Sequence, residues 1–137
     1  IPYAATANVA YPIDLVNKVR KALSYLDEGP AFLHVLAPCP PGWGFPDEKM
    51  IEIARLATET GYFPLYEWDH GRLIINPPSD MYMDKKLRKP LREFVKAQSR
   101  WAHVTDNEIK ELEKDIDDFL NYLWQLSMSS GVSAPYR

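Results

Sequence analysis

The chain has 137 residues, a formal net charge of −3 at pH 7 and a hydrophobic share of 46%. This length suits one domain with its own core, and the apolar share indicates a folded rather than a disordered chain. The acidic balance argues against a general nucleic-acid binder. The longest uncharged apolar stretch, residues 31–41, is too short to cross a bilayer, so we expect no contact with a membrane.

The single cysteine indicates the cellular compartment, and the first residue indicates that the chain is a fragment. A single cysteine excludes an internal disulfide framework and fits a reducing compartment, so we expect a cytoplasmic protein. The chain begins at Ile1 rather than at methionine, and we therefore expect a fragment whose N-terminal part is missing.

The first third of the chain predicts strands that alternate with a helix. Residues 2–10 are extended and small, and Ile13 to Leu26 carry apolar residues at helical spacing. The nearly all-apolar run Ala31 to Leu36 predicts a strand buried on both faces of a parallel sheet. Residues 38–46 contain four prolines and two glycines, which predict a stiff, solvent-poor loop.

The middle of the chain predicts a second helix and a hairpin. Asp47 is the expected N-cap of the helix, which ends near Gly61. The runs Phe63 to Trp68 and Arg72 to Asn76 are strand-like, and the Asp69-His70-Gly71 sequence between them indicates a hairpin.

The last third predicts two helices and a loose tail. A short helix is expected after Pro90, and Thr105 with Glu108 forms the pattern of a capping box for the final helix. We expect residues 127–137 to be loose. The final helix has an apolar seam with steps of three and four residues, which fits packing on its own domain and docking of another subunit equally well. The seam consists of Ile109, Leu112, Ile116, Phe119, Leu123 and Leu126.

The order β-α-β-α-β-β-α-α places the chain in the α/β class, with a β-hairpin and a helical tail. We divide it into an α/β part, residues 1–104, and a helical C-terminal extension, residues 105–137. Two parallel strands make a poor sheet alone, so we expect part of a larger sheet to be absent.

Cys39 follows the apolar strand and stands between Pro38 and Pro40, and three roles are open for its thiol. As a nucleophile it needs a base, but His34 lies five positions earlier and is expected to point to the opposite face. As a buried residue it acts as a small hydrophobe. As a metal ligand it needs partners outside this chain, because an iron–sulfur cluster usually takes four cysteines.

The block Ala37-Pro38-Cys39-Pro40-Pro41-Gly42-Trp43 resembles a segment in the C-terminal half of the β subunit of 2-oxoacid:ferredoxin oxidoreductases. The similarity extends in register from residue 1 to about residue 120, and the pyruvate-oxidising members are the closest. Members that act on branched-chain or other 2-oxoacids are the alternative within the family. The further stretches that carry the resemblance are residues 1–12, 29–36, 52–67, 88–91 and 98–101.

The resemblance implies a fold, a reaction and one site residue. Residues 1–104 are expected to be the C-terminal part of a thiamine-diphosphate-binding domain. The family decarboxylates a 2-oxoacid oxidatively with thiamine pyrophosphate and Mg²⁺, transfers the acyl group to coenzyme A, and passes electrons through [4Fe-4S] clusters to ferredoxin. Cys39 matches the family's fourth ligand of the cluster nearest the thiamine.

The same resemblance implies that the rest of the machinery lies outside this chain. The other cluster cysteines and the diphosphate motif are expected upstream of Ile1, so the chain alone should be inactive and hold no catalytic residue. Its expected partners are the missing N-terminal part of the β subunit, the other subunits, ferredoxin, the 2-oxoacid and coenzyme A. The alternative from another class is a non-catalytic piece that docks a partner through its helical tail, with Cys39 only buried.

Three further features each have two interpretations. Trp43 is either a cover for one side of the cluster or ordinary core packing. Thr6, Ala7 and Asn8 either line the crevice at the strand ends or form a packing edge. The basic run from Lys85 to Lys89 either meets acidic ferredoxin or coenzyme A phosphates, or is a solvated charged face.

Overall fold

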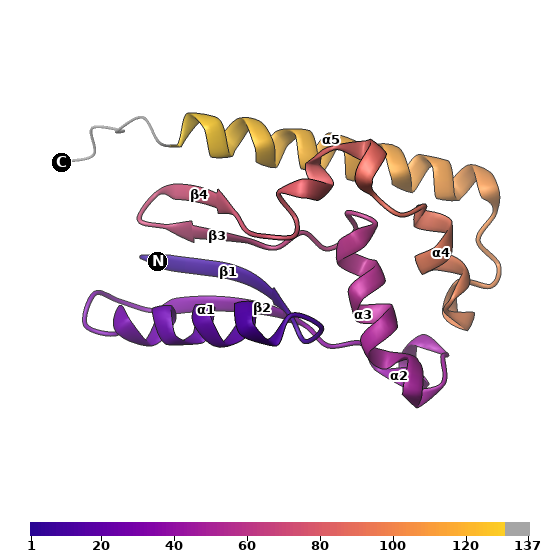
Figure 1. Ribbon diagram of the computed structural model, residues 1–137, viewed down its shortest axis with the longest axis horizontal. Helices are drawn as coiled ribbons and strands as arrows, with labels where there is room; N and C mark the ends of the chain where they lie inside the picture. The colour runs from indigo at the N-terminus through magenta and orange to yellow at the C-terminus, as the bar shows by residue number, and fades with distance from the viewer. Residues whose placement is uncertain (131–137) are drawn as a thin grey trace.

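The computed structural model describes residues 1–130 and contains a four-stranded mixed sheet with helices beside it and beyond one of its ends (Figure 1). The α/β class predicted from the sequence is thereby confirmed. Residues 131–137 of the predicted loose tail lie outside the described residues, whereas Ser127, Met128 and Ser129 belong to the last helix. In the described part of the chain, no helix has the length and apolar character needed to cross a membrane.

The strands lie in the order β2-β1-β3-β4. Strand β1 (Tyr3–Asn8) pairs in parallel with β2 (Ala31–Leu36), with Tyr3 opposite Ala31. Strand β3 (Tyr66–Asp69) is antiparallel to β1, and β4 (Arg72–Ile75) is antiparallel to β3.

The hairpin between β3 and β4 confirms the turn expected from the sequence. Its two central residues, His70 and Gly71, have φ values of 48° and 83°. Two successive positive φ angles are typical of the type I′ turn, whose twist matches that of the strands it joins.

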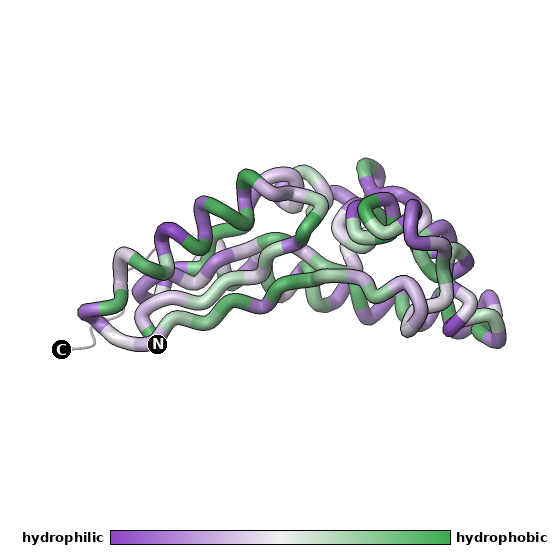
Figure 2. Tube along the Cα trace, turned by 90° about the horizontal axis from the view of Figure 1, so that it is seen from below, coloured by the Kyte–Doolittle hydropathy of each residue, from purple (hydrophilic) through white to green (hydrophobic). Residues whose placement is uncertain are grey.

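Helix α1 (Pro12–Ser24) covers one face of the parallel pair, and it ends at Ser24, short of the expected Leu26. Its buried Ala22 packs against the buried Tyr3 and Ala5 of β1. Figure 2, seen from below, shows α1 on one side of these strands. The small side chains of β1 allow the helix to approach the sheet closely.

Strand β2 corrects one expectation from the sequence. It has the predicted bounds, but it is not buried on both faces, because it is an edge strand with β1 as its only neighbour among the described residues. Phe32, His34 and Val35 are exposed. Apolar strands without charge are typical of the interior of parallel sheets, so the composition of β2 does not fit its edge position.

The segment between β2 and β3 lies beyond the carboxyl ends of the parallel strands. A short helix α2 (Pro40–Trp43) forms inside the loop predicted for residues 38–46. Asp47 does not cap the next helix as expected: it opens the 3-10 turn η1 (Asp47–Lys49), and α3 (Met50–Glu59) follows without a side-chain cap.

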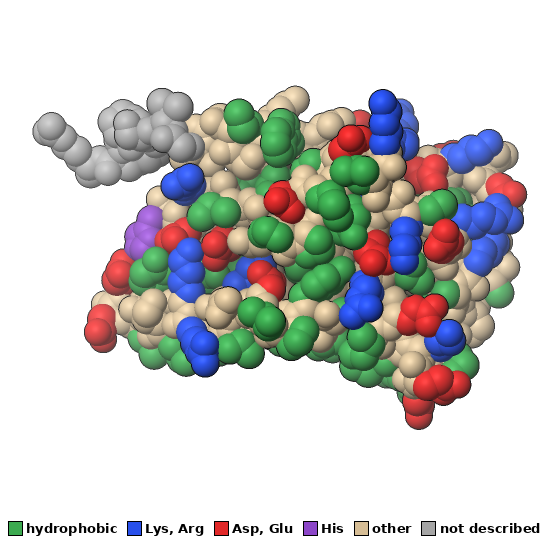
Figure 3. Space-filling model, viewed as in Figure 1, with side chains coloured by type: hydrophobic (Ala, Val, Ile, Leu, Met, Phe, Trp, Pro, Cys, Tyr) green, Lys and Arg blue, Asp and Glu red, His purple; other side chains and the backbone are tan. Residues whose placement is uncertain are grey.

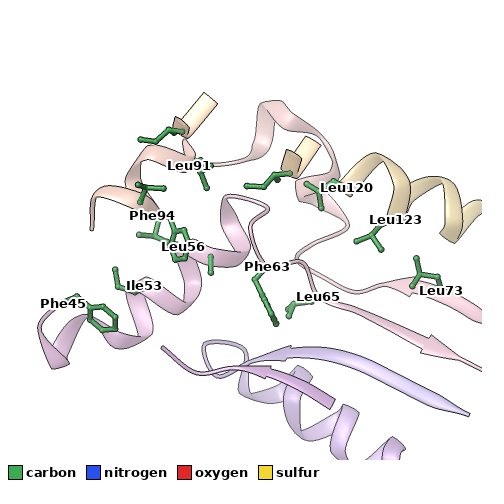
Figure 4. Packing of buried hydrophobic residues seen from close by; sticks show 14 residues of the cluster. Phe45, Ile53, Leu56, Phe63, Leu65, Leu73, Leu91, Phe94, Leu120 and Leu123 are labelled. Atoms are coloured by element: carbon green, nitrogen blue, oxygen red, sulfur yellow. The ribbon is translucent and has the colours of Figure 1, made fainter. Parts of the chain in front are cut away.

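The second half of the chain builds the larger core. Turns η2 (Met81–Met83) and η3 (Lys85–Leu87) lead to α4 (Leu91–Lys96), and η4 (Ser99–Trp101) leads to the long α5 (Asp106–Ser129). Figure 4 shows side chains from α3, α4, α5 and the hairpin meeting in one cluster. Its members are Phe45, Ile53, Leu56, Ala57, Phe63, Leu65, Leu73, Leu91, Phe94, Val95, Ile109, Ile116, Leu120 and Leu123.

Helix α5 begins as the sequence predicted and differs from it in one core residue. Thr105 and Glu108 form the expected capping box. Leu120 is buried, whereas Phe119, which the seam had placed inside, is exposed. At about 100° per residue, a step of four from the buried Ile116 returns closer to the same face than a step of three, so Leu120 rather than Phe119 points into the core.

Candidate functional site

Cys39 lies just past the carboxyl end of β2, at the point where the chain enters α2. The end of β2 is fixed to β1 because the Val9 N–H donates to the Leu36 carbonyl at 3.2 Å. Pro38, the residue before Cys39, is buried. Cys39 itself is the extended N-cap residue of α2, and its carbonyl accepts from the Trp43 N–H at 2.8 Å.

The thiol of Cys39 is exposed, which corrects the expectation of a solvent-poor loop. The interpretation of Cys39 as a buried hydrophobe is therefore wrong for this chain by itself. The prolines at positions 38, 40 and 41 still restrict the backbone on both sides, as their fixed φ predicts. Cys39 is therefore an accessible residue on a backbone segment of restricted motion, residues 38–41.

Two glycines leave space around the segment that carries Cys39. A Cβ at Gly42 would lie 3.3 Å from the Cys39 Sγ, so glycine leaves space on that side of the sulfur. Gly44 ends α2 with a φ of 75°, and a Cβ there would lie 1.8 Å from the Ser99 Oγ. The Ser99 N–H donates to the Gly44 carbonyl at 2.9 Å, so the turn after Cys39 is fixed to η4.

Trp43 continues this connection into the core. Its ring meets the rings of Phe45 and Phe94 edge to face, with centroids 6.3 and 6.4 Å apart. The Arg100 guanidinium lies over Trp43, 3.8 Å from the ring centroid, and 4.4 Å from that of Trp101. These contacts support the packing interpretation of Trp43.

The sequence did not predict that Arg100 lies beside Trp43, in the region of the Cys39 turn. Its Nε donates to the Oε1 of the buried Gln98 at 2.8 Å, and burial lowers the pKa of its guanidinium. Among residues 1–130, no ion pair joins it to a carboxylate. The only signal in the sequence was the pair of tryptophans at positions 43 and 101, which gives no indication of a shared cation.

The structure does not give Cys39 a base or a set of metal ligands of its own. His34 stacks edge to face on Phe63, with centroids 5.2 Å apart, on the strand rather than beside the loop. Within the described residues, no group of three or more His, Cys, Asp or Glu side chains gathers to hold a metal ion. Among the described residues, Cys39 therefore has no neighbouring set of metal ligands.

Thr6 and Asn8 are structural rather than open to a crevice. The Asn8 amide donates to the Ala54 carbonyl at 2.7 Å and to the Thr58 Oγ1 at 2.9 Å, which holds α3 across the end of β1. Thr6 Oγ1 donates to the Pro64 carbonyl at 2.7 Å. Both side chains and Ala7 are buried, so the packing-edge interpretation is confirmed.

A second polar cluster lies at the opposite end of the sheet. The Tyr3 hydroxyl donates to Glu67 at 2.6 Å, and Lys21 pairs with Glu67 and Asp69 at 3.2 and 2.7 Å. Burial and the neighbouring Glu67 raise the pKa of Tyr3. Lys21 pairs with both carboxylates and so joins α1 to β3, and we interpret this cluster as structural.

The basic run at positions 85–89 is largely used within the molecule. Lys85 and Arg88 pair with Asp117 of α5 at 2.5 and 2.8 Å, and Lys89 pairs with Glu59 of α3 at 2.8 Å. These pairs support the interpretation of this run as a charged structural face.

Comparison with known proteins adds what the geometry alone does not define. No protein-family model matches the chain. The chain is 52% identical to pyruvate synthase subunit PorB of Methanocaldococcus jannaschii over 118 residues, which are 86% of this chain and 37% of that protein. It is 48% identical to ketoisovalerate oxidoreductase subunit VorB of Pyrococcus furiosus over 114 residues, 83% of this chain and 35% of that protein.

A third relative is a second PorB subunit. Pyruvate synthase subunit PorB of Methanothermobacter marburgensis is 40% identical over 119 residues, 85% of this chain and 38% of that protein. The fold is α/β, and over most of its length the chain is similar to subunits of 2-oxoacid oxidoreductases, as the block around Cys39 indicated. Both PorB and VorB are among its relatives, and the chain spans little more than a third of their length.

Proposed function

We propose that this chain is the C-terminal part of the β subunit of a pyruvate:ferredoxin oxidoreductase and that Cys39 supplies one thiolate to a [4Fe-4S] cluster. The complete enzyme would convert pyruvate and coenzyme A to acetyl-CoA and CO₂ and pass the electrons to ferredoxin. The observation that carries the proposal is the 52% identity to a pyruvate synthase subunit over 86% of the chain. The assembled complex would be needed for the reaction.

The surroundings of Cys39 support its role as a ligand. A [4Fe-4S] cluster usually takes four cysteine thiolates, and the chain has a single cysteine, so it can provide one of the four. Cys39 is exposed, so its thiol is accessible to a ligand held by another polypeptide. Glycine at position 42 keeps one side of the sulfur free, because a Cβ there would lie 3.3 Å from the Cys39 Sγ.

When bound, the cluster would accept and release electrons one at a time. The residues of this chain would hold it still and shield it. The prolines at 38, 40 and 41 restrict the motion of the ligand, and Gly44 fixes the turn to Ser99. The Arg100 guanidinium lies on Trp43, four residues after Cys39, and holds the end of this turn against η4.

Thiamine pyrophosphate and Mg²⁺ would be bound mainly outside this chain. The polar residues that end β1 are already engaged: Asn8 bonds to α3, and Thr6 bonds to the chain before β3. Neither has a hydrogen-bonding group left that points to a ligand. We therefore assign no thiamine contact to Thr6 or Asn8.

A branched-chain substrate is the second candidate, and one observation favours it. The VorB proteins of three Pyrococcus species are 48–49% identical to this chain, more than the 40–42% of four of the PorB relatives. The assembled complex should be assayed on pyruvate and on ketoisovalerate at equal concentrations. We expect the larger kcat/KM on pyruvate, and a strong preference for ketoisovalerate would overturn this choice.

The ligand role of Cys39 is tested in the complex assembled without oxygen. We expect Cys39→Ala to abolish the electron paramagnetic resonance signal of one [4Fe-4S] cluster and the pyruvate-dependent reduction of ferredoxin. Cys39→Ser keeps the size of the side chain and should restore part of the signal at most. Glu48→Ala, an exposed change in the same region, is the control and should leave both readouts unchanged.

The same experiment separates the non-catalytic alternative. If Cys39→Ala assembles normally and retains every cluster signal and full turnover, the thiol is no ligand, and a docking role for the chain becomes the better explanation. If the variant loses the cluster signal while the complex still assembles, the alternative is excluded.

A further inference from the structure

Arg100 is a cation whose direction is fixed by the residues around it. Its Nε donates to the Oε1 of Gln98 at 2.8 Å, and the Nε2 of Gln98, a residue only 1% exposed, donates to the Phe94 carbonyl at 2.6 Å. The guanidinium also lies against two indole rings, 3.8 Å from the ring centroid of Trp43 and 4.4 Å from that of Trp101. A hydrogen bond to a core residue and two contacts with aromatic rings therefore hold this side chain before any ligand arrives.

Only the outer end of this guanidinium is free. Arginine has five N–H donors, one on Nε and two on each terminal nitrogen. Among residues 1–130, the terminal nitrogens of Arg100 make no hydrogen bond and no ion pair, and neither is enclosed by the protein. Because Gln98 occupies the Nε and the two indoles lie against the guanidinium, a ligand can approach the terminal nitrogens. Their planar fork matches a carboxylate, which accepts two parallel hydrogen bonds.

The neighbouring basic side chains differ from Arg100 in this respect. Both basic residues of α4, the helix that leads into η4, have partners: Arg92 pairs with Asp106, and the Lys96 Nζ donates to the Val104 carbonyl at 2.9 Å. Figure 3 shows basic and acidic side chains side by side at the right-hand end of the molecule, where Figure 1 places α4 and the start of α5. Among the described residues, Arg100 is thus a cation without a counter-ion, next to charges that are compensated.

The position is unfavourable for an uncompensated charge. Arg100 is half-buried, and this burial lowers the pKa of its guanidinium. The indole rings offset part of the cost, because they attract a cation. A carboxylate on the open terminal nitrogens would offset more of it, since a charge-assisted hydrogen bond in a partly desolvated site is stronger than one in water.

We propose that the terminal nitrogens of Arg100 bind an Asp or Glu side chain of another polypeptide, the one that approaches Cys39 in the assembled enzyme. This inference rests on the proposed function and adds a contact that the function itself does not require. Trp43, which contacts Arg100, ends the short helix that begins after Cys39, and the Trp43 N–H donates to the Cys39 carbonyl at 2.8 Å. One helical turn spans about 5 Å, so a polypeptide that reaches the exposed thiol docks beside Arg100.

A docked polypeptide fits this site better than a small free anion. One half-exposed ion pair contributes little to the binding of a molecule that is free in solution. A carboxylate carried by a docked polypeptide is already held near the arginine by the rest of the interface, so the same pair forms with a smaller loss of freedom. The anions of the proposed reaction, pyruvate and the phosphates of coenzyme A, are the alternative ligands that the test must separate.

The test joins the two groups covalently in the assembled complex. Arg100→Lys puts an amine in place of the guanidinium, and a carbodiimide condenses an amine with a carboxylate in contact with it, forming an amide bond while the carbodiimide takes up the water. We expect peptide mass spectrometry to find position 100 joined to an Asp or Glu outside residues 1–137, at least 10-fold more often than position 72 in Arg72→Lys. Arg72 is the matched control, because it is exposed and has no ion pair in the described structure. The absence of a cross-link above that control, or a cross-link only to a carboxylate within this chain, overturns the proposal.

Charge reversal distinguishes the contact from a merely structural role. We expect Arg100→Glu to lower the yield of assembled complex at least 10-fold, and a lysine at the cross-linked carboxylate to restore most of it. A loss that the second change does not restore shows that Arg100 serves the fold alone, and it overturns the proposal. Arg100→Gln should leave the KM values for pyruvate and coenzyme A within twofold of the unchanged complex. A larger rise in either value, with normal assembly, assigns the site to that substrate instead.

Failure of this contact and failure of the proposed function give different results. If Cys39→Ala loses its cluster signal but position 100 forms no cross-link, the ligand assignment stands and the Arg100 contact fails. If Cys39→Ala keeps every cluster signal while the cross-link forms, the contact stands and the ligand assignment fails.

Discussion

Lys18 is a buried cation, 3% exposed, on the face of α1 that packs against the sheet. Its Nζ donates to the Thr6 carbonyl at 2.8 Å and pairs with Asp14 one turn earlier at 2.9 Å. Burial lowers the pKa of Lys18, and the bond to Asp14 opposes this shift. A buried ion pair contributes little net stability, but an unpaired buried charge is costly.

Replacing Asp14 and replacing Lys18 should therefore lower the free energy of unfolding by different amounts. Asp14→Ala leaves the ammonium group with one backbone carbonyl, and we expect it to lower the free energy of unfolding by about 2 kcal/mol, less than a fully buried pair would because Asp14 is partly exposed. Lys18→Met removes the charge and keeps the volume, and the change should stay within about 1 kcal/mol. Urea unfolding at pH 7 measures both, and equal losses would contradict this account.

Gly44 permits the contact that supports the Cys39 turn. An alanine there adopts a left-handed conformation at a cost of about 1 kcal/mol and also meets Ser99, so we expect Gly44→Ala to lower stability by about 2 kcal/mol. Gly71→Ala is the matched control, since its φ is 83° and its added Cβ meets nothing within 4 Å; about 1 kcal/mol is expected. Combining Gly44→Ala with Ser99→Gly should recover part of the loss, and additive losses would show that the contact does not matter.

The sequence predicted the identity of the candidate ligand but not its surroundings. The strand before Cys39 and the prolines beside it were evident from the residues themselves. The exposure of the sulfur was not, because a loop of prolines and apolar residues has the composition of a buried one. The stacking of Arg100 on Trp43 joins residues 57 positions apart, and local patterns carry no information about such a contact.

At the scale of elements, an exposed histidine connects the end of α1 to the hairpin. The His70 ring nitrogens lie 2.6 Å from Glu28, in the turn after α1, and 2.6 Å from Asp69 of β3. The edge of Tyr25 meets the ring, with centroids 4.8 Å apart. Glu28 and then Asp69 raise the pKa of His70, because both stabilise the protonated ring.

The raised pKa fixes the direction of a pH dependence. The folded state holds the proton more tightly than the unfolded chain, whose histidine pKa is about 6.5. The contribution to stability is therefore complete below this value and is lost as the pH rises through the higher folded value. We expect the melting temperature to fall over this range and the fall to be smaller in His70→Gln. His103→Gln, whose ring makes no ion pair within residues 1–130, should keep the wild-type profile.

The elements themselves were predicted where the pattern is local. The hairpin turn His70-Gly71, the bounds of β2 and the capping box of α5 follow from residues within a few positions of each other. The exposed faces of β2 and the single shift from Phe119 to Leu120 depend on which elements lie beside these residues. An apolar strand such as β2 has the composition of an interior strand whether or not a neighbouring strand is present. Its position at the edge could therefore not be predicted from its residues.

At the scale of the whole molecule, the described chain has two apolar clusters of unequal size. The smaller joins α1 to the parallel strands through Tyr3, Ala5 and Ala22. The larger has fourteen buried members, and α5 contributes four of them. The division into residues 1–104 and 105–137 stays a prediction, and this distribution of buried side chains determines how it can be tested.

Removing α5 should prevent the rest of the chain from folding. Burying a Leu or Ile side chain contributes about 2 kcal/mol, so the four buried residues Ile109, Ile116, Leu120 and Leu123 contribute about 8 kcal/mol, which is comparable to the whole stability of a small domain. The loss of Ser130 also leaves the Leu73 N–H of β4 without its partner. A chain that ends at Val104 should therefore show no cooperative thermal transition in circular dichroism.

Two point variants on neighbouring residues of α5 also test whether this helix belongs to the core or is a separate extension. Leu120 is 3% exposed and Phe119 is 42% exposed, so Leu120→Ala should cost between about 2 and 5 kcal/mol, whereas Phe119→Ala should cost much less. If the shortened chain melts cooperatively near the wild-type temperature and both alanine variants are neutral, α5 is an appended extension with its own boundary at residue 105. If Leu120→Ala alone is destabilising, the helix that the sequence placed outside the α/β part belongs to the core that holds α3, α4 and the hairpin together.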